Sequence, residues 1–96
     1  MVKHIVTWKR QPQSDDAAIA EIKRQLEALV GRIDGLLHLE VGIDISLSEA
    51  SADLVLYSEF TDLAALHAYQ THPDHQAVIP LVQASCCQRQ VIDYHT

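Results

Sequence analysis

Alternating apolar and polar residues at positions 36–47 constrain the fold of this chain more than any other feature of its sequence. Every odd position in this segment carries leucine, isoleucine or valine, and every even position after the first carries a polar residue or glycine. Successive side chains of a β-strand point to opposite faces, so the pattern predicts a strand that is well buried on one face only. A polar turn at residues 48–52 and a second alternating segment at residues 53–60 predict a neighbouring strand.

A helical pattern precedes these two strands. Ser14 is a favourable N-cap residue, and the two aspartates that follow it suit the positively charged end of a helix. We expect the helix to end at Gly31 or at the pair Asp34-Gly35, because glycine is common just beyond helix ends. Six apolar residues recur at helical spacing over roughly five turns, namely Ile19, Ile22, Leu26, Leu29, Val30 and Ile33.

A second helix is expected after the two strands, and a proline should end it. Pro73 lacks an N–H group and disfavours the α conformation at the residue before it. A short helical run at residues 76–82 comes next, so residues 69–75 are expected to form a corner between two helices. This corner gathers a phenol, two imidazoles and a carboxylate, which belong to Tyr69, His72, Asp74 and His75.

Two further strands complete the predicted fold. Residues 2–9 alternate between an apolar face and a largely polar one, and residues 86–94 form a last strand with mixed faces. The order β-α-β-β-α-β is that of the ferredoxin-like α+β fold, in which helices cover one face of an antiparallel four-stranded sheet. A chain of this length makes one domain, which we assign to residues 1–96.

The uncovered back face of the predicted sheet is too apolar for water and too polar for a domain core. Apolar and charged side chains share this face, and such a mixture suits a contact between subunits. We therefore predict a homodimer in which two sheets pack through their back faces and form a dimeric α/β barrel. The apolar members of the back face are expected to be Ile5, Val55, Tyr57, Ile92 and Tyr94.

The net charge of −6 argues against nucleic acid and anionic membranes as partners, because both favour clusters of lysine and arginine. No apolar run reaches the roughly 18 residues that a membrane span requires. The N-terminal segment also lacks the apolar stretch of a signal peptide, so we expect a cytoplasmic protein. A bridge between the adjacent Cys86 and Cys87 would be strained, and we expect both to be reduced thiols.

Three segments of the chain carry a resemblance to a known family. They are the opening strand at residues 2–6, the run from Phe60 through Leu66, Tyr69-Gln70, His72-Pro73 and His75, and the closing Val91-x-Asp93-Tyr94. They are similar to the stress-responsive A/B barrel (Dabb) family over essentially the whole chain. The resemblance implies a dimeric α+β barrel of ferredoxin-like fold. Most members of that family have no known activity, some are linked to stress, and a plant member is a polyketide cyclase that needs neither metal nor cofactor.

The cyclase-like pattern of this family assigns catalysis to the tyrosine and to the second histidine of the corner, which are Tyr69 and His75 here. It also implies that His4, on the first strand, lines the same pocket. The first helix of the cyclase is rich in aromatic residues, whereas the first helix here is aliphatic, so the resemblance does not imply the same substrate. We expect the ligand-binding residues of the pocket to be His4, Val6, Trp8, Leu56, Ser58 and Val78.

Each polar residue of this predicted site also has a purely structural explanation. His4 could be a core histidine that one local hydrogen bond satisfies, Tyr69 continues the apolar stripe of its helix, and His75 could cap the helix that follows. In the functional explanation, a neutral imidazole accepts a proton near neutral pH, and a phenol donates a hydrogen bond to a carbonyl oxygen on which negative charge develops. Such a pair suits proton abstraction next to a carbonyl group.

The spacing of His72 and His75 occurs in metal sites, but Pro73 interrupts the regular helix that would place both imidazoles on one face. Zinc would also need a third ligand, for which His4 or His38 would have to serve. The sequence contains no phosphate-binding loop, dinucleotide fingerprint or Ser-His-Asp signature. We therefore predict that the protein uses no metal and no cofactor.

Three functions are compatible with the sequence. The first is the binding of a small hydrophobic or aromatic molecule, in a role linked to stress. The second is a cofactor-independent enzyme that uses Tyr69 and His75 on a carbonyl compound. The third is a structural protein whose pocket is filled by its own side chains. A cavity of several hundred cubic ångströms would favour the first two, because ligand pockets typically measure about 300–1,000 Å³.

Overall fold

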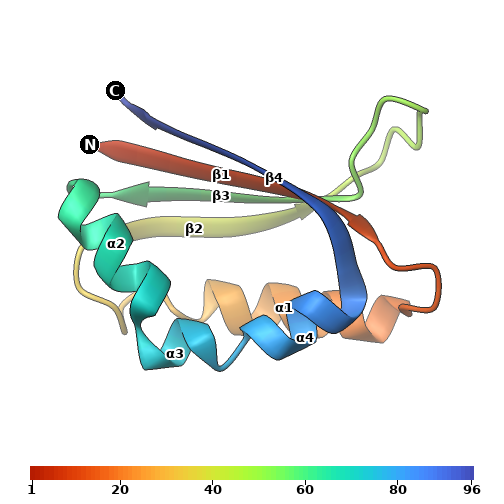
Figure 1. Cartoon of the computed structure of the whole chain (residues 1–96), viewed down its shortest axis with the longest axis horizontal. Coiled ribbons are helices and arrows are strands. Elements are labelled where there is room, and N and C mark those ends of the chain that lie inside the picture. Colours follow the sequence, from red (N-terminus) through yellow and green to blue (C-terminus); the bar gives the residue numbers. More distant parts are fainter.

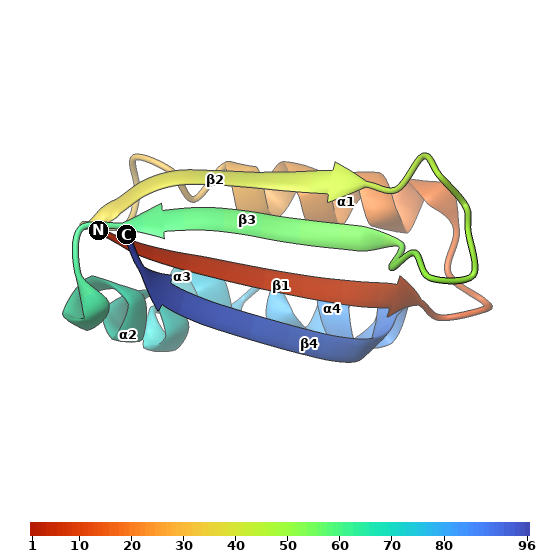
Figure 2. The ribbon, with the colours of Figure 1, turned by 90° about the horizontal axis from the view of Figure 1, so that it is seen from above.

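Four strands form one antiparallel sheet, and the helices lie against one of its faces (Figure 1). The computed structural model describes all 96 residues. Along the chain the elements are β1 (Val2–Arg10), α1 (Asp16–Glu27), β2 (Leu36–Ile43), β3 (Leu54–Phe60), α2 (Leu63–Thr71), α3 (Pro73–Gln76), α4 (Ile79–Ser85) and β4 (Cys86–His95). The strand order across the sheet is β2-β3-β1-β4, which can be followed in Figure 2. The predicted ferredoxin-like α+β fold is confirmed.

The core lies between the sheet and the helices. Alternate residues of β1 are buried, and the antiparallel register with β3 pairs Val2 with Phe60 and Val6 with Leu56. The inward side chains of β1, β3 and α1 form one continuous apolar cluster. Two buried polar residues interrupt its floor, His4 of β1 and the residue paired with it on β3, Ser58. The same register that builds the core therefore places polar groups inside it.

The start of β2 does not follow the simple alternation of the sequence. A β-bulge between Leu36 and His38 buries Leu36, and as a result Leu37 is 48% exposed. The residue before the strand, Gly35, adopts φ = 82°, and a Cβ atom there would lie only 2.5 Å from the Cβ of Ala65. The chain thus enters the sheet through a close contact with α2 that only glycine allows.

The end of β2 also differs from the prediction, which placed a strand over residues 36–47. The strand ends at Ile43 because a turn follows, in which the Asp44 carboxylate accepts a hydrogen bond from the Leu47 N–H at 2.8 Å. Ile45 is 92% exposed and Leu47 is 83% exposed. The last apolar residues of the alternating pattern therefore belong to an exposed loop, and the strand prediction is wrong for the last four positions.

Helix α1 is shorter than predicted at both ends. Asp15 rather than Ser14 is the N-cap, and its carboxylate accepts a hydrogen bond from the Ala18 N–H at 2.8 Å. The Ser14 hydroxyl instead donates to the carbonyl oxygen of Gln11, also at 2.8 Å. The helix ends at Glu27, before either predicted glycine, and turns carry the chain on to β2. No helix in the structure is both long and apolar enough to cross a membrane.

The proline corner forms where it was predicted, but a different histidine caps it. Pro73 is the first residue of α3, and the His72 imidazole accepts a hydrogen bond from the Asp74 N–H at 3.0 Å. His72 therefore caps α3, which leaves the His75 side chain free of that role. The single helical run predicted at residues 76–82 is instead divided between α3 and α4.

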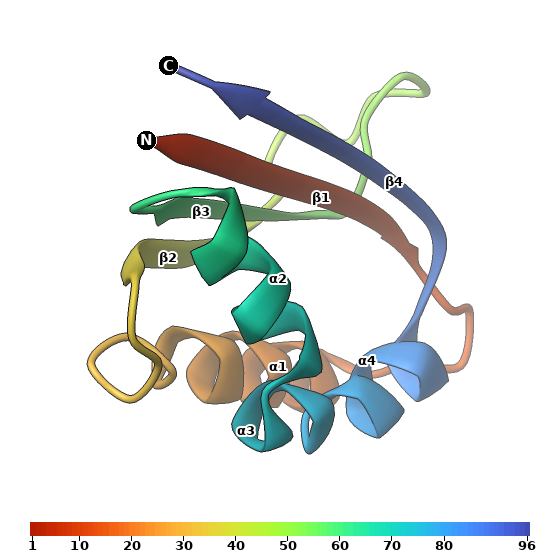
Figure 3. The same cartoon turned by 60° about the vertical axis from the view of Figure 1, so that its left-hand side comes forward.

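The edge strand β4 is the least covered strand of the sheet. It lies beside β1 and curves away from the helices, as Figure 3 shows, and residues 88–95 are all exposed. On the back face Ile92 is 59% exposed and Tyr94 is 39% exposed. The back face of a single chain therefore offers apolar side chains to whatever packs against it.

Candidate functional site

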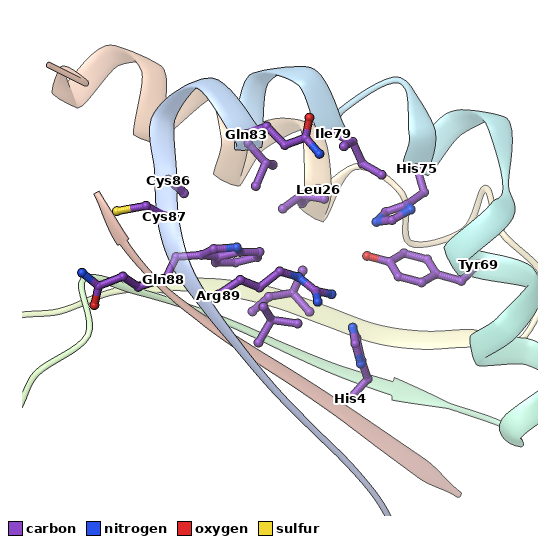
Figure 4. A pocket seen from close by; sticks show the side chains of 14 residues that line it. His4, Leu26, Tyr69, His75, Ile79, Gln83, Cys86, Cys87, Gln88 and Arg89 are labelled. Atoms are coloured by element: carbon purple, nitrogen blue, oxygen red, sulfur yellow. The ribbon is translucent and has the colours of Figure 1, made fainter. Parts of the chain in front are cut away.

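A cavity of about 400 Å³ lies between the sheet and the helices, next to the proline corner (Figure 4). Strands β1 and β3 form its floor, and side chains from all four helices and from β4 complete its walls. Nine of the 14 residues that line it are hydrophobic, so the body of any ligand inside it would have to be largely apolar.

Most of the predicted site residues line this cavity, namely His4, Val6, Trp8, Leu56, Tyr69 and His75. Ser58 does not, because it is fully buried and its hydroxyl donates a hydrogen bond to the carbonyl oxygen of His4 at 2.8 Å. Val78 lies in the turn between α3 and α4 and lines a separate groove against α1, whereas its neighbour Ile79 reaches the cavity. The structure corrects the prediction for Ser58 and Val78, and the roles of the other residues stay predictions.

Tyr69 places its hydroxyl group inside the cavity. The residue lies in the last turn of α2 and is 1% exposed, and its ring packs against that of Phe60 with a centroid distance of 5.1 Å. The hydroxyl points across the cavity in Figure 4. Burial raises the pKa of Tyr69, so the side chain is a protonated phenol at neutral pH and can donate a hydrogen bond.

The His75 imidazole lies against the ring of Tyr69, with a centroid distance of 4.3 Å and an interplanar angle of 40°. Its Nδ1 is 3.3 Å from the carbonyl oxygen of Gln70. A carbonyl oxygen only accepts hydrogen bonds, so we assign the proton of the neutral ring to Nδ1, which leaves Nε2 as an acceptor. Burial lowers the pKa of His75, and nearby positive groups act in the same direction. The ring is therefore mainly neutral at pH 7 and able to accept a proton.

His4 forms the polar part of the cavity floor. It is 3% exposed, and its Nδ1 forms a hydrogen bond with the carboxylate of Asp93, the residue directly opposite it on β4. Because the carboxylate accepts, Nδ1 is the donor, and Nε2 is left for the cavity side. The ring meets that of Tyr69 edge-on, with a centroid distance of 6.3 Å. The hydrogen bond to Asp93 is enough to satisfy a purely structural histidine. A functional role of His4 stays a prediction.

Arg89 brings a positive charge into the cavity from the edge strand. A β-bulge in β4 sets Gln88 and Arg89 together opposite Trp8 of β1, and Gln88 adopts φ = 51°. In Figure 4 the Arg89 side chain extends from this bulge into the cavity, between Tyr69 and His4. No aspartate or glutamate lines the cavity, so the guanidinium of Arg89 makes the charge of the cavity positive.

A model of the stress responsive A/B barrel domain matches residues 2–96 of the chain. The chain belongs to this family. The match covers all the strands and helices described above, so the resemblance noted in the sequence is confirmed.

Known relatives of this A/B barrel domain include proteins from plants and bacteria. A stress-response A/B barrel domain-containing protein of Arabidopsis thaliana is 31% identical over 80 residues, which are 82% of this chain and 30% of that protein. A structure from Bacteroides fragilis, described as a dimeric protein of unknown function with a ferredoxin-like fold, is 30% identical. The alignment covers 99% of this chain and 95% of that one, with a TM-score of 0.89. The hydroxynitrile lyase of Passiflora edulis, 18% identical, shares the fold over 97% of this chain and 90% of its own, with a TM-score of 0.84.

The polar groups of this A/B barrel domain form a complementary set at one end of the cavity. The phenol of Tyr69 and the guanidinium of Arg89 can both donate hydrogen bonds to a ligand oxygen. The Nε2 atom of His75 can accept a proton, and the environments of the phenol and the imidazole move their pKa values in opposite directions. Donors to an oxygen beside a neutral base are the groups required for proton transfer next to a carbonyl.

The histidine pair of the corner is not arranged as a metal site in this A/B barrel domain. The Nδ1 of His72 already accepts the Asp74 N–H, and His38 lies on the back face beside Tyr57, with a centroid distance of 6.0 Å. No group of three or more histidine, cysteine, aspartate or glutamate side chains could hold a metal ion. That the protein works without metal or cofactor stays a prediction.

Sequence reasoning missed the wall of the cavity that is built mainly by α4 and β4. For Arg89 a signal existed: Val91 and Asp93 pair with Val6 and His4 of β1, and alternation places Arg89 on the same face. For α4 no signal existed, because the break between α3 and α4 was not predicted. The missed residues are Leu26, Ile79, Val82, Gln83, Cys86, Cys87, Gln88 and Arg89.

Proposed function

We propose that this protein binds a small, mostly apolar molecule that carries a carbonyl oxygen. The observation that carries this proposal is the cavity of about 400 Å³ between the sheet and the helices. Its volume lies within the range of about 300–1,000 Å³ of ligand pockets, and its walls combine apolar surface with a few convergent polar groups. A structural protein with a filled pocket, the third possibility compatible with the sequence, would leave no such volume.

The geometry supports one orientation of the ligand. Its apolar body would lie over Val6, Trp8 and Leu56, which form the apolar part of the floor. Its carbonyl oxygen would accept a hydrogen bond from the Tyr69 hydroxyl, which points into the cavity. A C–H group next to that carbonyl would then lie near Nε2 of His75, since the centroids of the Tyr69 and His75 rings are 4.3 Å apart.

A second candidate function is cofactor-independent catalysis of proton transfer next to that carbonyl. The observation in its favour is that burial raises the pKa of Tyr69 and lowers the pKa of His75. Two adjacent groups with pKa values moved apart can serve as hydrogen-bond donor and base at the same pH. The cyclase-like members of the family support this candidate, and Tyr69 and His75 would be the catalytic residues. The likeness to the Passiflora hydroxynitrile lyase concerns the fold alone.

We also propose that the chain forms a homodimer through the back faces of two sheets, which would close a dimeric α/β barrel. The exposed apolar residues Ile92 and Tyr94 on that face support this arrangement. The Bacteroides relative, described as dimeric, supports it as well. A link to stress rests on the description of the Arabidopsis relative, of which this chain spans 30% of the length. A cytoplasmic location and the lack of a nucleic-acid partner stay predictions.

Sedimentation tests the dimer. The parent chain, of 10.7 kDa, should sediment at twice its mass at micromolar concentration. Ile92→Asp should convert it to a folded monomer, because the charge would be buried in the contact. Leu63→Asp is the matched control, since Leu63 is an exposed aliphatic residue on α2, away from the back face. A parent chain that stays monomeric would contradict this part of the proposal.

A cavity-filling substitution tests ligand binding. Small aliphatic and aromatic ketones, esters and acids would be screened by thermal shift, and hits would be measured by calorimetry. Val82→Phe should abolish binding, because Val82 lines the cavity and a larger ring there would occupy it. Val30→Phe is the matched control, because Val30 is exposed and does not line the cavity. Hits that bind Val82→Phe as tightly as the parent chain would place binding elsewhere and contradict the proposal.

A further inference from the structure

Arg89 is the one lysine or arginine of the chain whose charged group has no protein partner. The chain has seven lysine and arginine residues in total. The other six, Lys3, Lys9, Arg10, Lys23, Arg24 and Arg32, each form an ion pair or a hydrogen bond. In a chain with 13 acidic residues, pairing is the rule for its cations. The exception lies at the cavity, where a ligand rather than a protein carboxylate could meet the guanidinium.

The backbone holds Arg89 in this place at a local conformational cost. Gln88, the residue before it, adopts φ = 51°, in the left-handed region that is unfavourable for residues other than glycine. The bulge that Gln88 forms places Arg89 opposite Trp8 of the cavity floor. Bulges and left-handed residues are frequent next to functional sites, where they direct a side chain.

The cavity around this guanidinium is suited to an anion. Its wall contains no aspartate or glutamate. The nearest acidic partner on the same strand face, Asp93, is already bonded to His4. The Tyr69 hydroxyl, a hydrogen-bond donor, points toward the guanidinium in Figure 4. Burial is the main cause that lowers the pKa of His75, and the charge of Arg89 acts in the same direction, which agrees with its position inside the site.

We propose that Arg89 makes the cavity selective for apolar monocarboxylic acids, whose carboxylate it binds together with the Tyr69 hydroxyl. A guanidinium presents two parallel N–H donors that match the two oxygens of a carboxylate, which a neutral carbonyl cannot use in the same way. The apolar part of the acid lies over the floor that Trp8 and Leu56 provide. This inference rests on the proposed ligand-binding function and names the class of ligand.

Matched pairs of acids and amides separate this inference from the proposed function. The probes are benzoate, 3-phenylpropionate, 4-phenylbutyrate and octanoate, each beside its primary amide of nearly the same size and shape. Affinities are measured by calorimetry at pH 7.5, and chemical-shift changes of the backbone amides at Tyr69, His75 and Arg89 locate the binding site. The best acid should bind about tenfold more tightly than its amide, and this ratio should shrink at high salt.

Two substitutions at Arg89 and one control test the residue itself. Arg89→Gln should weaken the binding of the acid far more than that of the amide, because only the acid loses a charged partner, and the preference for the acid should disappear. Arg89→Lys should keep part of the preference, because it retains the charge and loses the forked geometry. Arg24→Gln is the control for net charge, since Arg24 is exposed on α1 and pairs with Glu21 outside the cavity. Melting temperatures should stay close to that of the parent chain, because Arg89 is exposed and has no bond to lose.

The possible outcomes are distinct. Equal affinity for acid and amide, with shifts at the cavity, would overturn the inference and leave the proposed function intact. Binding of no member of any pair at millimolar concentration would overturn both. A preference for the acid that survives Arg89→Gln would assign it to another group. A weakened dimer in Arg89→Gln with unchanged probe affinity would place Arg89 in the subunit contact, and that result would also overturn the inference.

Discussion

The layer between the sheet and the helices has a closed half and an open half. The closed half lies beneath α1, where Ile19 and Ile22 are buried among other apolar side chains. The open half lies beneath α3 and α4 and contains the cavity with its polar groups. Both halves lie on the same face of one sheet, so the difference comes from the helices above it.

The two halves differ because a continuous helix fills space more completely than a broken one. Helix α1 runs for 12 residues and turns Ile19, Ile22 and Leu26 toward the sheet. The segment from α2 to α4 is interrupted at Pro73 and again before Ile79, and its pieces are too short to present such a stripe. In a small domain, a site with polar groups can therefore arise where regular packing is interrupted. Here the corner between the helices determines where that interruption lies.

The largest expected effect concerns the closed half. Ile22→Ala should lower the free energy of unfolding by about 2–5 kcal/mol, because it leaves a cavity in a region where packing is tight. Val82→Ala, in the wall of the open half, should lower it by less than about 1.5 kcal/mol, because Val82 is only partly buried and borders space that already exists. Urea denaturation measures both. Equal losses would mean that the two halves are packed alike.

Removal of the Tyr69 hydroxyl should affect the open half alone. Tyr69→Phe should weaken the binding of a carbonyl ligand by about 0.5–1.5 kcal/mol, the usual value of one hydrogen bond. The ring still fills its space against Phe60, so the melting temperature should change little. Tyr57→Phe is the control, since its hydroxyl bonds Glu59 on the back face. A variant that binds like the parent chain and melts much lower would make Tyr69 a packing residue.

The smallest expected effect is a pH dependence of stability that comes from His75. Its pKa in the folded chain lies below the value of about 6.5 expected in the unfolded chain. The unfolded state therefore takes up this proton first as the pH falls. Stability should be full above the unfolded pKa, and it should decline as the pH drops toward the folded pKa. The closed half, which has no buried histidine of this kind, should add no such dependence.

Melting curves between pH 8 and pH 5 measure this effect as a difference between variants. The melting temperature of the parent chain should fall relative to that of His75→Gln as the pH decreases, because only the parent chain carries the unfavourable protonation. His67→Gln, at an exposed position on α2, controls for the loss of a histidine. If the two curves stay parallel over the whole range, His75 does not titrate differently in the folded and unfolded states.

Local patterns were reliable wherever one segment decided its own structure. The alternation of β1 and β3 and the effect of Pro73 were predicted correctly, because strand faces and proline geometry depend on neighbouring residues. The alternating pattern wrongly predicted that the strand continues through Ile45. A turn in which the Asp44 carboxylate accepts a hydrogen bond from the Leu47 N–H follows the strand instead. Ser58 was wrongly predicted to line the cavity for a similar reason. Its hydroxyl donates a hydrogen bond to the carbonyl oxygen of His4, which belongs to another strand.

The sequence alone determined the order of the strands and of the first two helices, the family, and the presence of Tyr69 and His75 at a corner. It did so because periodicity and proline act over a few residues. Only the tertiary structure decided that the space beside this corner stays open, and that Arg89 reaches into it from a bulge in β4. Cavity volume and the meeting of side chains from distant strands depend on how whole layers pack, which no local pattern encodes.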